Sequence, residues 1–149
     1  MKHNDCDTEP HSLMLKPNDY WATPQSLFDE LHREFNFTID VCANADNAKL
    51  PRYWTEEDDA LSKSWAGERC FMNPPYSQVE RWLKKAWSEG WVNRGLVVAL
   101  INVATDTEYW HNYVEGIAEV RFLRGRVKFV PPPGIKASTP RYASAICIF

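Results

Sequence analysis

The chain has 149 residues and a mass of 17.3 kDa, which suits a single domain. Hydrophobic residues make up 44% and charged residues 25%, which is typical of a globular protein and excludes a disordered chain. The net charge of −3 and the pI of about 5.8 exclude a polycationic coat or arm, although a local nucleic-acid site stays open.

The sequence also indicates the cellular compartment, the extent of the domain and the absence of a metal site as expectations. No apolar run approaches the ~18–20 residues of a membrane span, and Met1 to Asp5 have no apolar core of a signal peptide. We therefore expect a cytoplasmic protein without a membrane partner. Residues 1–19 predict a flexible tail and residues 20–149 a single domain. No metal site is expected, because the four cysteines and four histidines show no ligand spacing.

The first half of the chain predicts one helix, one strand and an irregular acidic stretch. Thr23 and Pro24 are typical of a helix start, with Thr23 as the N-cap. The helical spacing of apolar residues then continues to Phe35. Residues 37–41 alternate as a strand. Residues 43–59 are polar and acidic, with weak helical character over 45–50.

The second half alternates strands and helices. Residues 69–72 predict a short strand, which Pro74 and Pro75 end. Ser77 then caps an amphipathic helix that Gly90 ends. Residues 96–103 predict a strand buried on both faces, and residues 105–114 predict a short helix.

The C-terminal region predicts a hairpin and a last strand. Residues 120–123 and 127–130 flank Arg124-Gly125-Arg126, which indicates a tight turn. Residues 131–142 predict a Pro-rich loop and residues 143–149 a final strand. The fold class is therefore α/β, with a mostly parallel sheet, one antiparallel strand and a C-terminal antiparallel hairpin.

Charge is uneven along the chain. From Ala118 to Phe149 six basic residues face one acid, so this stretch carries +5 and the other 117 residues carry −8. Such a distribution favours a surface that meets an anion, while a solvated hairpin remains the alternative. The candidate contacts are Arg124, Arg126, Lys128, Lys136 and Arg141.

The strongest candidate for a catalytic site is the segment Asn73-Pro74-Pro75-Tyr76. It follows a predicted strand, and open α/β sheets bind ligands at the carboxyl ends of their strands. The Asn73 side chain and the Pro74 carbonyl offer two neighbouring acceptors for an amino group with two N–H donors. Tyr76 offers a flat face for stacking. A strand-ending turn with an Asn cap is the alternative interpretation.

Asn-Pro-Pro-Tyr in this setting resembles the motif of amino-methyltransferases. Further segments extend the resemblance over roughly residues 20–149 to the small phage-encoded DNA N6-adenine methyltransferases, the phage Dam-like family. These segments are Trp21-Ala22-Thr23-Pro24, residues 37–43, Asn47-Ala48-Lys49, Asp58-Asp59-Ala60-Leu61, Trp65 and residues 125–129.

The resemblance implies a compact Rossmann-like fold that binds S-adenosylmethionine. It implies that Thr23-Pro24, with Trp21, meets the methionine end of the cofactor. Asp40 would take the ammonium or a ribose hydroxyl, beside Cys42 and Ala43, and Asp59 would accept from the adenine amino group. The sequence departs from the wider superfamily because it lacks a Gly-rich turn after the first strand. The alternatives are a strand-end cap for Asp40, a solvated acid for Asp59 and simple packing for Cys42.

The implied reaction is methyl transfer to N6 of a flipped adenine in DNA. Residues 73–76 would form the catalytic pocket, and the basic residues would hold phosphates. Residues 131–142 would recognise the base sequence of the DNA, since we expect no room in the chain for a separate recognition domain. RNA, cytosine N4 and protein glutamine remain alternative substrates, and a non-catalytic nucleic-acid-binding module is the alternative of another class. A homodimer also stays open.

Overall fold

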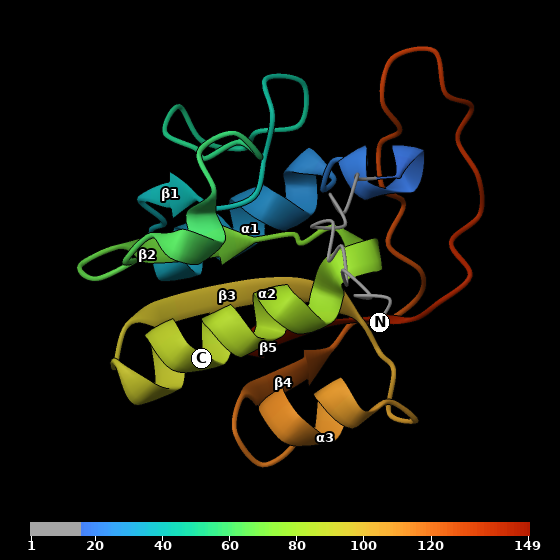
Figure 1. Ribbon diagram of the computed structural model, residues 1–149. Helices are drawn as coiled ribbons and strands as arrows, with labels where there is room; N and C mark the ends of the chain where they lie inside the picture. The colour runs from blue at the N-terminus through green and yellow to red at the C-terminus, as the bar shows by residue number, and fades with distance from the viewer. Residues whose placement is uncertain (1–15) are drawn as a thin grey trace, which may run out of the picture.

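The computed structural model describes residues 16–149 as one α/β unit (Figure 1). Of the predicted tail over residues 1–19, residues 1–15 lie outside the described residues, whereas residues 17–19 belong to a 3₁₀ turn that Asp19 bonds to Ser77. The helices and strands run in chain order as follows: η1 (Pro17–Tyr20), α1 (Gln25–Phe35), β1 (Ile39–Asp40), η2 (Ala60–Ser62), β2 (Arg69–Met72), η3 (Tyr76–Gln78), α2 (Val79–Ala86), η4 (Trp87–Val92), β3 (Leu96–Asn102), α3 (Glu108–Tyr113), β4 (Glu119–Phe122) and β5 (Ser144–Ile148).

One five-stranded sheet organises the fold, in the order β1-β2-β3-β5-β4. The first three strands are parallel, and β5 is antiparallel to both β3 and β4. Because β4 thereby points the same way as β3, β5 is the one antiparallel strand, as the sequence predicts. Strand β3 lies at the centre, and residues 97–101 are buried, which confirms the prediction for this run.

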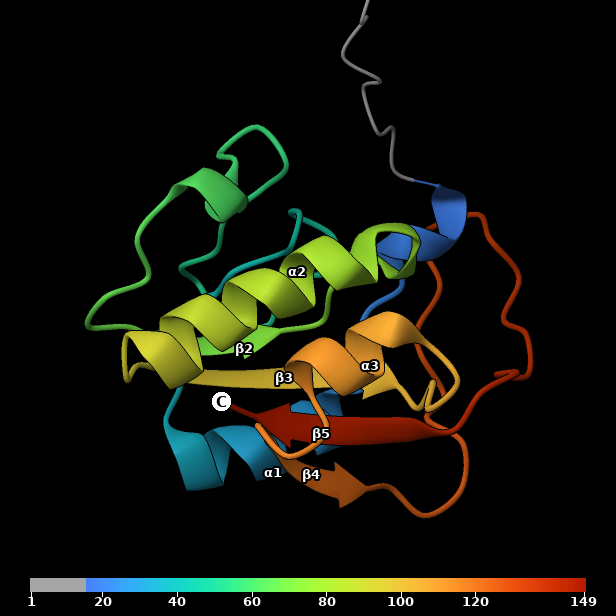
Figure 2. The same ribbon diagram turned by 60° about the horizontal axis from the view of Figure 1, so that its bottom comes forward.

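Helices cover both faces of the sheet (Figure 2). On one face, Trp82, Leu83 and Ala86 of α2 pack with Trp110 of α3 against alternate residues of the strands. On the other face, Phe28, Leu31 and Phe35 of α1 form an aromatic and aliphatic cluster with the remaining strand residues. The predicted apolar stripes of α1 and α2 therefore face the sheet, one on each side, and form part of the two hydrophobic cores.

The predicted C-terminal hairpin is wrong. Strand β4 pairs with β5, in the register Val120 opposite Cys147, and residues 127–130 form no strand. A long loop over residues 123–143 joins β4 to β5. Only Val130 pairs locally, through an isolated antiparallel bridge with Ala22.

Helix boundaries also differ from the prediction in four places. Helix α1 begins after Pro24, and Thr23 makes no capping hydrogen bond. Residues 45–50 form turns and no helix. Ser77 lies inside η3, so Gln78 precedes α2. The helix passes Gly90 as the π-helical η4, where a Cβ on Gly90 would lie 2.4 Å from the Phe149 Cβ.

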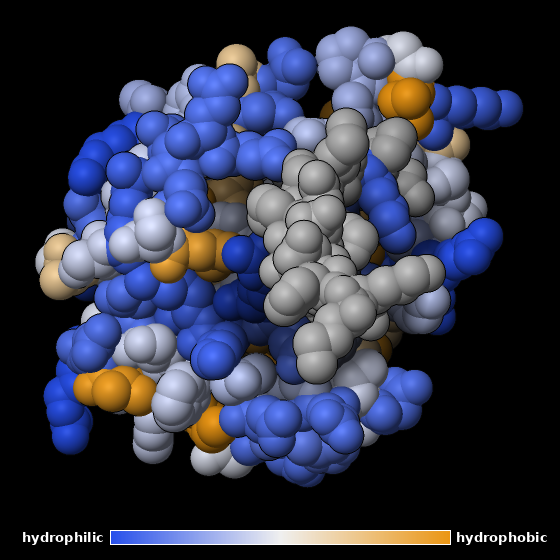
Figure 3. All heavy atoms as spheres, in the orientation of Figure 1, coloured by the Kyte–Doolittle hydropathy of each residue, from blue (hydrophilic) through white to orange (hydrophobic). Residues whose placement is uncertain are grey.

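The visible face of the molecule is mostly hydrophilic, with hydrophobic residues in small separate spots (Figure 3). No helix within residues 16–149 combines the length and apolar character needed to cross a membrane.

Candidate active site

A cleft of about 510 Å³ lies where β1 and β2 end. Cys42 and Ala43 follow β1, and Pro75 follows β2, so the parallel strands bring these predicted residues to one edge of the sheet. Ala60, Leu61 and Trp82 supply an apolar wall. The remaining lining residues are polar: Asp19, Tyr20, Asn44, Asn47, Thr55, Glu56, Glu57, Asp59, Gln78 and Arg81.

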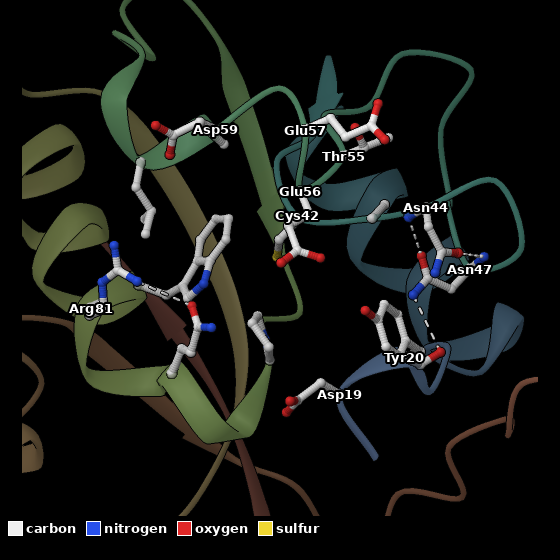
Figure 4. Close-up of a pocket in the computed structure, with 16 residues that line it drawn as sticks. Asp19, Tyr20, Cys42, Asn44, Asn47, Thr55, Glu56, Glu57, Asp59 and Arg81 are labelled. Carbon is white, nitrogen blue, oxygen red and sulfur yellow. Dashed lines mark hydrogen bonds between the residues drawn. The ribbon is translucent and has the colours of Figure 1, made fainter. Parts of the chain in front are cut away.

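The cleft is acidic. Four carboxylates line it, from Asp19, Glu56, Glu57 and Asp59, against the single guanidinium of Arg81. Figure 4 shows these side chains around a common central space, with Arg81 and Asp59 on one side and Asn44 and Tyr20 on the other. A ligand with positive charge and hydroxyl groups suits such a lining.

Asp40 lies behind the cleft wall, at the end of β1, and does not line the cleft itself. Its side chain is 2% exposed, and its Oδ2 accepts a hydrogen bond of 3.1 Å from the Lys49 backbone N–H. The other oxygen, Oδ1, is buried without a partner among the described residues. Burial raises the pKa of Asp40 to about 6, and the backbone N–H groups of Lys49 and Cys42 offset part of that rise.

Two asparagines build the turn that follows β1. The Asn44 Oδ1 accepts from the N–H groups of Asp46 and Asn47, at 2.9 and 3.0 Å. The Asn47 Oδ1 accepts from the Asn44 N–H at 2.7 Å. Side chains thus satisfy the backbone of this turn, which explains how it forms without the glycines of the wider superfamily.

The segment 73–76 follows β2 as predicted, with Pro74 and Pro75 buried. The Asn73 Nδ2 donates to the Trp21 carbonyl at 3.1 Å, which leaves its side-chain oxygen as an acceptor. The Tyr76 ring meets Phe129 of the long loop edge-on, with 6.1 Å between centroids. Burial raises the pKa of Tyr76 well above its usual value.

Tyr76 borders a second hollow, of about 300 Å³, that lies next to the cleft. Tyr109 lines this hollow from α3, and Gln78 and Arg81 line both spaces. The helical turn after Pro75 therefore stands between a larger acidic cleft and a smaller space with two tyrosines.

Five buried side-chain atoms in residues 16–149 have no hydrogen-bond partner, and they mark this region. Four belong to residues singled out from the sequence: Trp21 Nε1, Thr23 Oγ1, Asp40 Oδ1 and Tyr76 Oη. The fifth is Nε1 of Trp82, which lines the cleft. Buried polar groups are almost always paired, so each exception calls for an explanation; of these five residues, Trp82 lines the cleft and Tyr76 lines the second hollow.

Asp59 differs from its neighbour Asp58 although the sequence presents them alike. The Asp58 Oδ2 accepts from the N–H and hydroxyl of Thr55, at 2.8 and 3.0 Å. Asp59 lines the cleft with a φ of 48°, and no hydrogen bond from a described residue reaches its carboxylate. Aspartate adopts this left-handed conformation more readily than most residues, and Asn36 and Arg94 share it. The place of Asp59 in the cleft wall, and not its φ, is what distinguishes it.

The predicted nucleic-acid contacts all belong to the long loop over residues 123–143. All five side chains are exposed and make no ion pair or hydrogen bond with another described residue. Arg121, just before the loop, instead pairs with Glu34 at 2.8 Å and Glu119 at 2.7 Å. The unpaired cations of this region are therefore Arg124, Arg126, Lys128, Lys136 and Arg141.

Residues 16–149 hold no group of three His, Cys, Asp or Glu side chains placed to bind a metal ion. Burial raises the pKa of the Cys42 thiol well above its usual value, so its thiolate is disfavoured at neutral pH.

Sequence reasoning identified the ends of both strands but missed most of the cleft wall. Tyr20, Asn44, Asn47, Arg81 and Trp82 were assigned no role, although all line the cleft. The Asn47-Ala48-Lys49 segment of the resemblance was the one indication for the turn. Conversely, five predicted site residues do not line the cleft: Trp21, Thr23, Pro24, Asn73 and Pro74. Two of them, Asn73 and Trp21, are joined by a hydrogen bond.

Comparison with known proteins gives the family of this chain. The model of the family "DNA N-6-adenine-methyltransferase (Dam)" matches residues 11–149. The chain is 33% identical over 127 residues to a DNA N-6-adenine-methyltransferase of Haemophilus phage HP1, covering 79% of this chain and 73% of that protein. It is 36% identical over 76 residues to the Escherichia coli K12 protein YfdM, whose name includes the word methyltransferase. The match covers 46% of this chain and 82% of that protein. A DNA N-6-adenine-methyltransferase of Escherichia phage T1 is 27% identical over 70 residues, or 46% of this chain and 29% of that protein. The chain belongs to the DNA N-6-adenine-methyltransferase (Dam) family.

Proposed function

We propose that this protein transfers a methyl group from S-adenosylmethionine to the N6 amino group of adenine in DNA, on a compact Rossmann-like methyltransferase fold. The observation that carries the proposal is the set of unpaired buried atoms on Trp21, Thr23, Asp40 and Tyr76; Tyr76 belongs to the segment 73–76, and the Trp21 carbonyl accepts from Asn73. These atoms belong to the residues that the family resemblance assigns to cofactor and base.

The acidic cleft fits S-adenosylmethionine, which carries a sulfonium, an ammonium and ribose hydroxyls. Asp40 lies behind the cleft wall, and its unpaired Oδ1 would hold the ammonium or a hydroxyl of a cofactor that displaces part of that wall. Asp59 would accept from the adenine amino group of the cofactor, against the apolar side chains of Leu61 and Trp82. Thr23 and Trp21 would hold the methionine end. When bound, S-adenosylmethionine supplies an electrophilic methyl group on its sulfur.

Asn73 would activate the target amino group. The N6 lone pair is delocalised into the adenine ring, so the nitrogen is a poor nucleophile. Acceptance of N6–H bonds by the Asn73 oxygen and the Pro74 carbonyl would favour a tetrahedral nitrogen and localise that lone pair. The hydrogen bond from Asn73 Nδ2 to Trp21 keeps the oxygen of the amide available. Asn73 is no base, so the proton would leave to water after transfer.

The target adenine would leave the duplex and stack on Tyr76. Phe129 supports the Tyr76 ring from the long loop, which also carries the unpaired cations. This loop exposes Val130, Ile135 and Tyr142 among those cations, at 50%, 45% and 58%. Exposed aromatic and aliphatic groups between basic side chains are typical of a surface that meets phosphates and bases.

The test is transfer of a labelled methyl group from S-adenosylmethionine to duplex DNA, followed by nucleoside analysis of the product. We expect label in N6-methyladenine alone, and loss of the label with Asn73→Ala. Label in cytosine N4, in RNA or in protein amide would keep the chemistry and overturn the substrate. Binding of DNA without any methyl transfer would overturn the enzymatic function.

A further inference from the structure

Four consecutive residues, 19–22, each bond a different part of the candidate site. We call this segment the strap. At its start, Asp19 accepts from Ser77 twice: Oδ1 from the backbone N–H at 3.0 Å and Oδ2 from the hydroxyl at 2.6 Å. Ser77 directly follows Tyr76, so this contact fixes the strap to the end of the catalytic segment.

The next three residues use only their backbones. The Tyr20 carbonyl accepts from Asn47 Nδ2 at 3.3 Å, in the turn after β1. The Trp21 carbonyl accepts from Asn73 Nδ2 at 3.1 Å. Ala22 exchanges two hydrogen bonds with Val130 of the long loop, at 2.7 and 2.8 Å. Both ribbon views place η1 beside this loop (Figures 1 and 2).

The strap therefore joins the cleft, the catalytic amide and the basic loop in one short piece of chain. Asp19 is the only one of its four residues that makes its link with a side chain. The 3₁₀ turn η1 has only four residues and little stability of its own. Asp19 also accepts from the Lys16 N–H at 2.7 Å, which closes η1 at its start.

We propose that Asp19 is a positioning residue that couples occupancy of the cofactor cleft to binding of DNA by the long loop. The proposal rests on the function proposed above. Asp19 and Tyr20 line the cleft, so a ligand bound there would contact both residues and favour the bonded strap. A strap in place holds Asn73 and Val130 in the arrangement that DNA requires. Each ligand then lowers the cost of ordering for the other, and by linkage the effect is equal in both directions.

The experiment measures binding of S-adenosylhomocysteine, the unreactive product, by calorimetry with and without duplex DNA. In the parental protein we expect DNA to tighten this binding about fivefold or more, and the ligand to tighten DNA binding by the same factor. Asp19→Ala and Ser77→Ala should reduce both factors below about twofold. Ser77→Thr, which keeps the hydroxyl, should restore the parental factor.

Glu30→Ala is the matched control, because Glu30 is an exposed acid on α1 and no hydrogen bond or ion pair links it to the site. It should leave the coupling unchanged. If Asp19→Ala no longer binds S-adenosylhomocysteine, Ser77→Ala, which removes one hydrogen bond, decides the question. Parental coupling in Ser77→Ala, or no coupling in the parental protein, would overturn the proposal. Methyl transfer by the parental protein is measured separately, so failure of the strap and failure of the proposed function give different results.

Discussion

Asp40→Asn should stabilise the ligand-free protein while it weakens cofactor binding. Burial raises the pKa of Asp40 to about 6, from a usual value near 4. This rise in the pKa corresponds to about 3 kcal/mol by which the fold disfavours the ionised carboxyl. Asparagine has the same shape, carries no charge and can still accept from the Lys49 N–H. We therefore expect the free energy of unfolding at pH 7.5 to rise by about 1–3 kcal/mol.

The pH dependence of unfolding shows whether the ionised Asp40 carboxyl stabilises or destabilises the fold. The folded protein binds the Asp40 proton more tightly than the unfolded chain, so this group destabilises the fold progressively as pH rises from about 4 to about 6. Below pH 4 the carboxyl is protonated in both states, and the advantage of Asp40→Asn should vanish. Urea unfolding at a series of pH values measures this. Asp46→Asn, an exposed substitution in the same turn, is the control and should show no such trend.

Asp40→Asn should weaken cofactor binding, although it stabilises the fold. A cationic group at Oδ1 favours the ionised carboxyl, so the affinity for S-adenosylhomocysteine should rise with pH between about 5 and 7 and binding should release a proton. Asp40→Asn should bind about 10–100-fold more weakly, the range for loss of a charged hydrogen bond. Calorimetry in two buffers of different ionisation enthalpy detects the proton. A less stable Asp40→Asn protein with parental affinity would refute both the burial argument and the role.

Three further changes probe the chemical step and the DNA surface. Asn73→Ala should keep cofactor affinity and lower single-turnover methyl transfer by ~10²–10³, whereas Asn73→Asp should retain substantial activity; a parental rate in Asn73→Ala would contradict the role. Tyr76→Ala should lose ~1–3 kcal/mol of stacking on the target base. A mismatch at the target should partly rescue it in the same assay, and absence of rescue would argue against base extrusion. Arg126→Ala and Lys128→Ala should each flatten the salt dependence of DNA binding by about one unit of slope. Arg121→Ala is the control, because Arg121 is already paired, and equal slopes for all three would show that the loop is not the contact.

Local pattern predicted the elements well but not their partners. The strand 69–72 and the buried run from Leu96 follow from apolar runs alone, and the structure confirms both. The hairpin at Gly125 failed because pairing is decided by burial at long range. Strand β5 is buried over Ser144 to Cys147 and needs a neighbour on each side; β3 supplies one and β4 the other.

Pro51 and a long-range contact explain two other departures from the predicted helices. The side chains of Asn44 and Asn47 cap each other's backbone N–H groups as at a helix start, but only one turn closes, from the Ala48 N–H to the Asn44 carbonyl at 3.0 Å, before Pro51. At Gly90 the helix continues because Glu89 turns inward, where its carboxylate meets Lys85 at 2.6 Å and the Trp65 N–H at 3.3 Å. The contact of Glu89 with Trp65 links residues 24 positions apart, and no local pattern contains it.

The acidic run at residues 56–59 shows most clearly where sequence reasoning ends. Asp58 and Asp59 are the same residue in adjacent positions, so composition gives no reason to assign them different roles. The structure distinguishes them by conformation: Asp58 closes a turn on Thr55, and that turn leaves Asp59 at a φ of 48° with its carboxylate in the cleft. One acid thus satisfies the backbone, while the next lines the cleft in a left-handed conformation. Asp58→Ala should therefore weaken cofactor binding indirectly, through loss of the turn, whereas Asp59→Ala should weaken it with the turn intact.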